Sequence, residues 1–182
     1  MTEKLSDETI AALVDQHSDA LLRFFRGSGI AYSDAADFVQ TTFETLLRKN
    51  DGAILDPKLY LWGIARKKVL QYRERHKTVD EFRSSRVIPE AVTTASQRLD
   101  RRFRVMALLQ HLDEQQRTAF LLRCEGLALE VIAETMKLSL ATVKRKLKQA
   151  RAQIEQVASE DTHAFGDEAL TVDDVIDSYR RD

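Results

Sequence analysis

The sequence predicts an all-α protein with two small helical domains, a flexible linker between them and an acidic C-terminal tail. Three observations support this fold class. Glycine and proline are sparse, at six and two of 182 residues. Apolar residues recur at spacings of three and four, and no segment alternates apolar and polar residues for long. The hydrophobic content of 43% is enough for folded cores, and the length allows one domain or two small ones.

Three amphipathic helices are expected in the first domain, over residues 5–80. The first runs from Ser6 to Arg26. The second runs from Asp34 to Lys49, with Ser33 as its N-cap. The third runs from Pro57 to His76 or beyond, since proline suits the first turn of a helix.

The second domain, over residues 97–157, is expected to contain a helix-turn-helix. Residues 128–136 have the period of a short helix, and residues 137–139 interrupt it. Ser139 is a good N-cap for the next helix, which buries an apolar stripe and presents cations outward. This is the arrangement with which a recognition helix meets the DNA major groove. The candidate DNA-binding residues on it are Thr142, Lys144, Arg145, Lys148 and Arg151.

The order of these residues suggests how they divide the contacts. A recognition helix enters the groove N-terminus first, so Thr142, Lys144 and Arg145 should lie nearest the base edges. Lys148 and Arg151 are better placed for phosphates, which position a protein without reading sequence. An ordinary helix pair with a solvated basic face is the alternative.

The third expected helix combines an aromatic residue with cations. Arg66, Lys67 and Arg73 could neutralise phosphates, and Trp62 could stack on an unpaired base. The competing interpretation puts the cations on a solvated face and Trp62 in the core. The pattern favours the core for Trp62 and leaves the cations open.

The charge distribution is uneven. Residues 155–182 hold nine acidic residues and two arginines, a net charge of −7, which leaves +6 for residues 1–154 of the chain's total of −1. A basic body with an acidic tail fits a nucleic-acid binder whose tail, residues 158–182, could compete for the basic surface. Within the tail, residues 170–179 could form a short amphipathic helix capped by Thr171, either folding over the DNA-binding face or only solubilising the protein.

Between the domains, residues 81–96 are expected to be a linker with some helix at its start, because the apolar period weakens there.

Enzymatic activity is not expected. The four histidines are scattered, no metal-ligand spacing or phosphate-cradling glycine loop occurs, and neither a cofactor nor a metal is expected. The single cysteine, Cys124, allows no intramolecular disulfide and is expected to be a core residue. No apolar run reaches membrane-spanning length and no signal peptide opens the chain, so we expect a cytoplasmic protein with no membrane partner.

Three motifs in this order resemble the extracytoplasmic-function (ECF) sigma factors of bacterial RNA polymerase, in the sigma-70 family. Residues 34–43, DAADFVQTTF, resemble region 2.2, which is typically DAEDLVQETF. Residues 61–66, LWGIAR, resemble the start of regions 2.3 and 2.4, and residues 116–151 resemble region 4.

The resemblance implies that the two domains bind different targets and that the protein catalyses no reaction. The first domain would dock on the clamp helices of core RNA polymerase and capture the melted −10 element, with the loop at residues 50–55 reading a flipped base. The second domain would read the −35 element of promoter DNA, and the linker would thread the RNA-exit region. An anti-sigma factor is a possible partner. The runner-up function is a stand-alone helix-turn-helix transcriptional regulator, and a protein-only adaptor is disfavoured by the cation-rich final helix.

The departures from region 2.2 suggest a form of control. The family usually has Glu at the positions of Ala36 and Thr41. Interface charge pairs can contribute on the order of one to several kcal/mol, so losing two acids should weaken docking. A phosphate would restore about two negative charges. We therefore hypothesise a Ser/Thr kinase that activates the protein at Thr41, or less readily at the inward-facing Thr42.

The alternative is that Thr41 is a neutral surface residue and that the remaining acids suffice. By the resemblance, the polymerase-binding residues are Asp34, Asp37 and Glu44.

Overall fold

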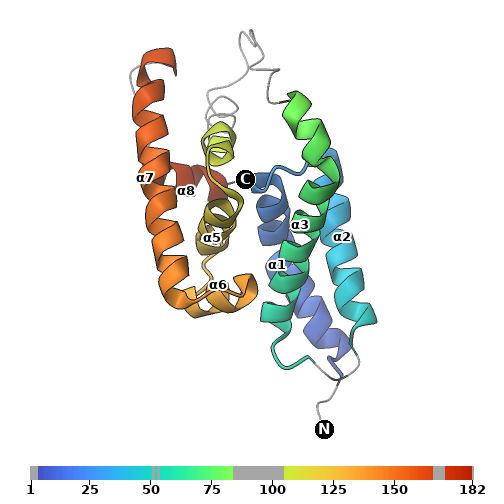
Figure 1. Cartoon of the computed structure of the whole chain (residues 1–182). Helices are drawn as coiled ribbons and strands as arrows, with labels where there is room; N and C mark the ends of the chain where they lie inside the picture. Colours follow the sequence, from blue (N-terminus) through green and yellow to red (C-terminus); the bar gives the residue numbers. More distant parts are fainter. Residues whose placement is uncertain (1–3, 51, 53, 84–104, 166–170, 182) are drawn as a thin grey trace.

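The computed structural model describes residues 4–50, 52, 54–83, 105–165 and 171–181. All regular secondary structure in these ranges is helical, which confirms the predicted fold class. Figure 1 shows two groups of helices side by side, with the C-terminal segment between them. Part of the expected linker, residues 84–96, lies outside the described ranges, as do residues 97–104.

The first group consists of α1 (Asp7–Gly27), α2 (Tyr32–Arg48) and α3 (Pro57–Arg83). Helix α1 begins as predicted, because the Ser6 side chain accepts a hydrogen bond from the backbone N–H of Thr9. The predicted start of α2 is wrong. Its N-cap is Ala31, which offers no side-chain hydrogen bond, and Ser33 lies inside the first turn. Ile30 is buried directly before this cap and fixes the entry of the chain two residues earlier than expected.

An aromatic cluster fills the core of this first group. Trp62 is 1% exposed and meets the Phe24 ring edge to face, with 5.6 Å between the ring centroids. Phe25, Leu46 and Ala65 are also fully buried around it. The core interpretation of Trp62 is therefore correct, and in this conformation the indole has no face free for a nucleic-acid base.

The second group contains a helical segment at residues 105–110, then α5 (Glu114–Cys124), α6 (Leu129–Met136) and α7 (Leu140–Phe165). Asp113 and Gln116 form a capping box at the start of α5. Helix α6 begins after Ala128, which provides no side-chain cap. It ends at Lys137, which adopts the left-handed conformation with φ 56° and ψ 44°, where glycine would be free of steric cost.

Helix α8 (Val172–Arg180) closes the structure. Thr171 caps it through a capping box with Asp174, so the predicted cap and helix are both found. This helix contacts α1, α5 and α7, and it buries Val172, Val175 and Tyr179.

The two groups of helices are packed against each other. Buried residues from both groups and from α8 belong to one apolar cluster. Helix α3 of the first group also contacts α6 of the second, and α1 contacts α5. The described chain therefore adopts a closed arrangement rather than two separated domains.

Candidate nucleic-acid and polymerase interfaces

The start of α7 has the geometry of a recognition helix. The Ser139 hydroxyl accepts a hydrogen bond from the backbone N–H of Thr142 at 3.2 Å, as the sequence predicts for an N-cap. Val143, Ala150 and Ile154 are buried and orient the helix. The cations on its opposite side are exposed, and they are Lys144, Arg145, Lys148 and Arg151.

Thr142 and Lys146 differ from these exposed cations. Thr142 is half-buried, and its hydroxyl lies 2.9 Å from that of Ser139, within the cap. Lys146 forms an ion pair with Asp113 at 3.0 Å and so joins α7 to the start of α5. Burial alone would raise the pKa of the Asp113 carboxyl, but the backbone N–H of Gln116 and the Lys146 ammonium lower it overall.

The three cations proposed for α3 have different environments. Lys67 is exposed. Arg66 is half-buried, and its Nε atom is buried without a hydrogen-bond partner. Arg73 is half-buried and donates a hydrogen bond to the carbonyl oxygen of Ser28 at 2.9 Å, which ties α3 to the end of α1. Of these three side chains, Lys67 is the best placed to meet a phosphate in this conformation.

The loop expected to read a flipped base is only partly described. The Asn50 side chain is occupied, because it accepts from the backbone N–H of Leu5 at 2.7 Å and donates to the Leu5 carbonyl at 2.9 Å. Leu55 is 85% exposed just before α3 begins. Residues 51 and 53 lie outside the described ranges.

Helix α2 presents the acids proposed for the polymerase. Asp37 and Glu44 are exposed, and Asp34 is half-buried. Thr41 lies between them on the same helix and is half-buried. Thr42, by contrast, is fully buried and donates a hydrogen bond to the Phe38 carbonyl at 2.6 Å. Of the two candidate threonines, only Thr41 is partly exposed.

A lysine that the sequence analysis did not single out lies against Thr41. The Lys68 ammonium of α3 donates a hydrogen bond to Thr41 Oγ1 at 3.0 Å. Burial lowers the pKa of Lys68, the nearby Arg48 lowers it further, and Glu44 partly offsets them. Thr41 is thus surrounded by both signs of charge. Only the packing of α3 on α2 brings Lys68 there, so no local motif could have identified it.

Cys124 is a buried core residue, as expected. Burial and the nearby Glu125 carboxylate raise the pKa of its thiol to about 12, so it stays protonated near neutral pH. Within the described ranges, no cluster of three or more histidine, cysteine or acidic side chains could hold a metal ion. Among the helices of those ranges, none combines the length and the apolar character that a membrane span requires.

Comparison with known proteins gives one family match and similar solved structures. The Sigma-70, region 4 family matches residues 102–154. The structure of CnrH in complex with the cytosolic domain of CnrY matches with a TM-score of 0.65 and 25% identity, covering 86% of this chain and 91% of that one. The sigma factor RpoE from Bartonella quintana, in complex with the anti-sigma factor NepR, matches with a TM-score of 0.65 and 22% identity, covering 86% and 99%. No curated protein sequence matches.

The part of the chain that contains the helix-turn-helix, residues 102–154, therefore matches a sigma-70 region 4 unit. Over most of the chain, the fold is similar to the folds of CnrH and of the sigma factor RpoE.

Proposed function

We propose that this chain directs RNA polymerase to specific promoters and that the negative charge at Thr41 sets how tightly it docks. The proposal that Thr41 controls docking rests on the position of its hydroxyl. It is half-buried on the acidic face of α2, and a lysine contacts it at 3.0 Å.

The promoter contacts are assigned to the exposed cations. Lys144 and Arg145, with Thr142, would meet the base edges of a duplex element at the start of α7. Lys148 and Arg151, one and two turns later, would meet phosphates. Lys67 of α3 is the corresponding phosphate contact in the first domain.

The polymerase contact is assigned to Asp34, Asp37 and Glu44. The same region carries Arg48 and Lys68, so the cations offset much of its negative charge. A basic docking surface would be attracted only weakly to such a balanced patch.

Phosphorylation of Thr41 would change this balance. The phosphate would add about two negative charges and three acceptor oxygens. Because Lys68 Nζ already lies at 3.0 Å from the hydroxyl, the ammonium could pair with the phosphate and leave the exposed carboxylates free for the polymerase. A Ser/Thr kinase is therefore the regulatory partner that we propose.

An anti-sigma factor is a further partner. CnrH and RpoE were both determined in complexes, RpoE with an anti-sigma factor. We extend this kind of partner to the present chain on the basis of the shared fold.

The experiment compares wild type, kinase-treated wild type, Thr41→Glu and Thr41→Ala for affinity to core polymerase and for run-off transcription. We expect Thr41→Glu to bind about tenfold more tightly than Thr41→Ala, which corresponds to about 1.4 kcal/mol. Ala12→Glu is the matched control, since Ala12 is exposed on α1 and the substitution adds the same charge away from α2.

Equal affinities for all forms would exclude control at Thr41. If instead every form bound a promoter duplex tightly without polymerase and none initiated transcription, the stand-alone regulator would replace the sigma-factor proposal.

A further inference from the structure

Three helices from distant parts of the sequence meet at Gly27. This residue ends α1, and a Cβ atom placed on it would lie 2.7 Å from Leu121 Cδ2 of α5 and 3.0 Å from Tyr179 Cε2 of α8. Both distances are too short for real contacts without a shift of the neighbours. The absence of a side chain at Gly27 therefore allows α1, α5 and α8 to approach one another.

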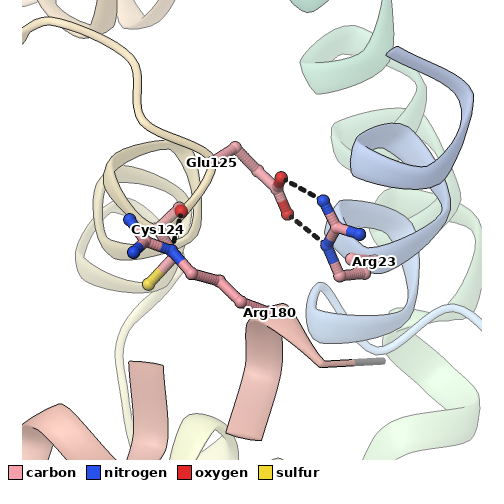
Figure 2. Close-up of polar contacts among 4 residues, drawn as sticks. All are labelled: Arg23, Cys124, Glu125 and Arg180. Carbon is pink, nitrogen blue, oxygen red and sulfur yellow. Dashed lines mark hydrogen bonds and ion pairs between the residues drawn. The ribbon is translucent and has the colours of Figure 1, made fainter. Parts of the chain in front are cut away.

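Polar contacts reinforce this junction at the C-terminal end of α5 (Figure 2). Arg23 of α1 donates two hydrogen bonds to the Glu125 carboxylate, from Nε at 3.1 Å and from Nη2 at 2.8 Å. The Glu125 side chain is only 3% exposed, so this bidentate pair is shielded from solvent. Arg180 of α8 donates from Nε to the Cys124 carbonyl at 2.8 Å, which places a cation at the negative end of the α5 dipole.

Helix α8 contributes the apolar part of the junction. Val175 is fully buried and Tyr179 is 4% exposed. Because α8 contacts α1 from the first group and both α5 and α7 from the second, it bridges the two DNA-binding units. The Tyr179 hydroxyl is buried near the Glu125 carboxylate, and burial together with that carboxylate raises the pKa of the phenol well above its ordinary value.

Helix α8 affects how the two groups of helices, and the surfaces proposed to bind DNA, are placed relative to each other. In the closed arrangement α3 contacts α6, the helix that leads into the recognition helix. The two units are thus held in one fixed relation, whereas a sigma factor must reach two separate promoter segments at once. Helix α8 does not cover the start of α7, where Lys144 and Arg145 are exposed. Further along α7, Arg151 lines a hollow together with Asp173 and Asp177 of α8.

We propose that α8 is an intramolecular clamp that keeps the two units closed and must leave its seat before the protein binds polymerase and promoter. This inference rests on the proposed sigma-factor function. It also changes the expectation for the tail, because inhibition comes from holding the units together and not from masking the recognition helix.

The test measures the separation of the units and the polymerase affinity in the full-length chain. Fluorescent labels on cysteines introduced at Gln16 of α1 and Ala152 of α7, both exposed, report the separation by energy transfer. Cys124 is buried and protonated, so it does not compete for the labels.

Two substitutions should open the clamp by different means. Gly27→Ala pushes α1 away from Leu121 and Tyr179, and Val175→Asp places a carboxylate in the apolar seat of α8. We expect lower energy transfer and about tenfold tighter polymerase binding in both, within the usual range of allosteric coupling. The matched controls are Gly63→Ala, whose added Cβ meets nothing within 4 Å, and Ala12→Asp at an exposed position.

Far-ultraviolet circular dichroism establishes that each variant keeps its helices. Folded variants that open without a gain in polymerase affinity would overturn the clamp and leave the sigma-factor proposal intact. Folded variants that keep wild-type energy transfer would overturn it as well. If no form binds polymerase, the sigma-factor proposal fails, and the inhibitory role of the clamp fails with it.

Discussion

Helices α3 and α7 are both rich in cations, but several of these side chains have different environments on the two helices. On α7, four of the cations lie opposite the buried stripe and are exposed, namely Lys144, Arg145, Lys148 and Arg151. On α3 the helix packs against α2 on one side and α6 on another, so Arg73 is engaged with a carbonyl and Lys68 with a hydroxyl. The comparison is the reason why we assign the promoter contacts mainly to the exposed cations of α7.

Removal of the exposed α7 cations should have the largest effect on promoter binding. The double variant Lys144→Ala/Arg145→Ala should lose promoter affinity by about 1–3 kcal/mol for each side chain if both reach base edges. The folded helix should be retained, because both residues are exposed. Binding of holoenzyme to promoter and scrambled duplexes measures this effect. Unchanged discrimination between the duplexes would remove these residues from base readout.

On α3, Arg73 should affect stability more than DNA binding. Arg73→Ala removes the hydrogen bond to the Ser28 carbonyl, and we expect the free energy of unfolding to fall by about 1–3 kcal/mol. Urea unfolding measures it. Lys67→Ala is the matched variant, and it should leave stability unchanged and lower the salt dependence of DNA binding by about one charge. The reverse pattern would contradict the assignment of the two cations.

A substitution in the turn before α7 should have a smaller effect, on thermal stability. Lys137 has φ 56°, a conformation that costs a residue with a side chain roughly 1 kcal/mol relative to glycine. Lys137→Gly should therefore raise the melting temperature by a few degrees, which calorimetry can measure. A lower melting temperature would show that the side chain stabilises the turn in another way.

The smallest effect concerns pH. The pKa of Asp113 is lowered in the folded chain, so its contribution to stability is present above the carboxyl's ordinary range and is lost as pH falls through the folded value. Asp113→Asn should flatten the dependence of unfolding on pH in the acidic range and should remove the ion pair with Lys146. An identical pH profile for the variant would show that other carboxyls dominate.

The sequence predicted those features that depend on local chemistry. The caps at Ser6, Ser139 and Thr171 and the buried Trp62 follow from propensities within a few residues. The start of α2 was missed because the burial of a neighbouring residue, and not a capping side chain, decides where that helix begins.

Contacts between distant elements were beyond prediction from one sequence. Arg23 and Glu125 are 102 positions apart, and neither belongs to a motif. The contact of Lys68 with Thr41 likewise depends on how α3 crosses α2. For the tail, the amphipathic period of α8 indicated that one face of this helix is packed. It could not indicate that this face packs against α1, α5 and α7.

Run-off transcription with sigma-free core polymerase shows whether this chain starts transcription and whether Thr41 controls it. We expect little transcript from the unmodified chain, more from the kinase-treated chain and from Thr41→Glu, and no gain from kinase treatment of Thr41→Ala. If neither the modified nor the unmodified chain starts transcription from any promoter in a genomic library, the chain does not act as a sigma factor.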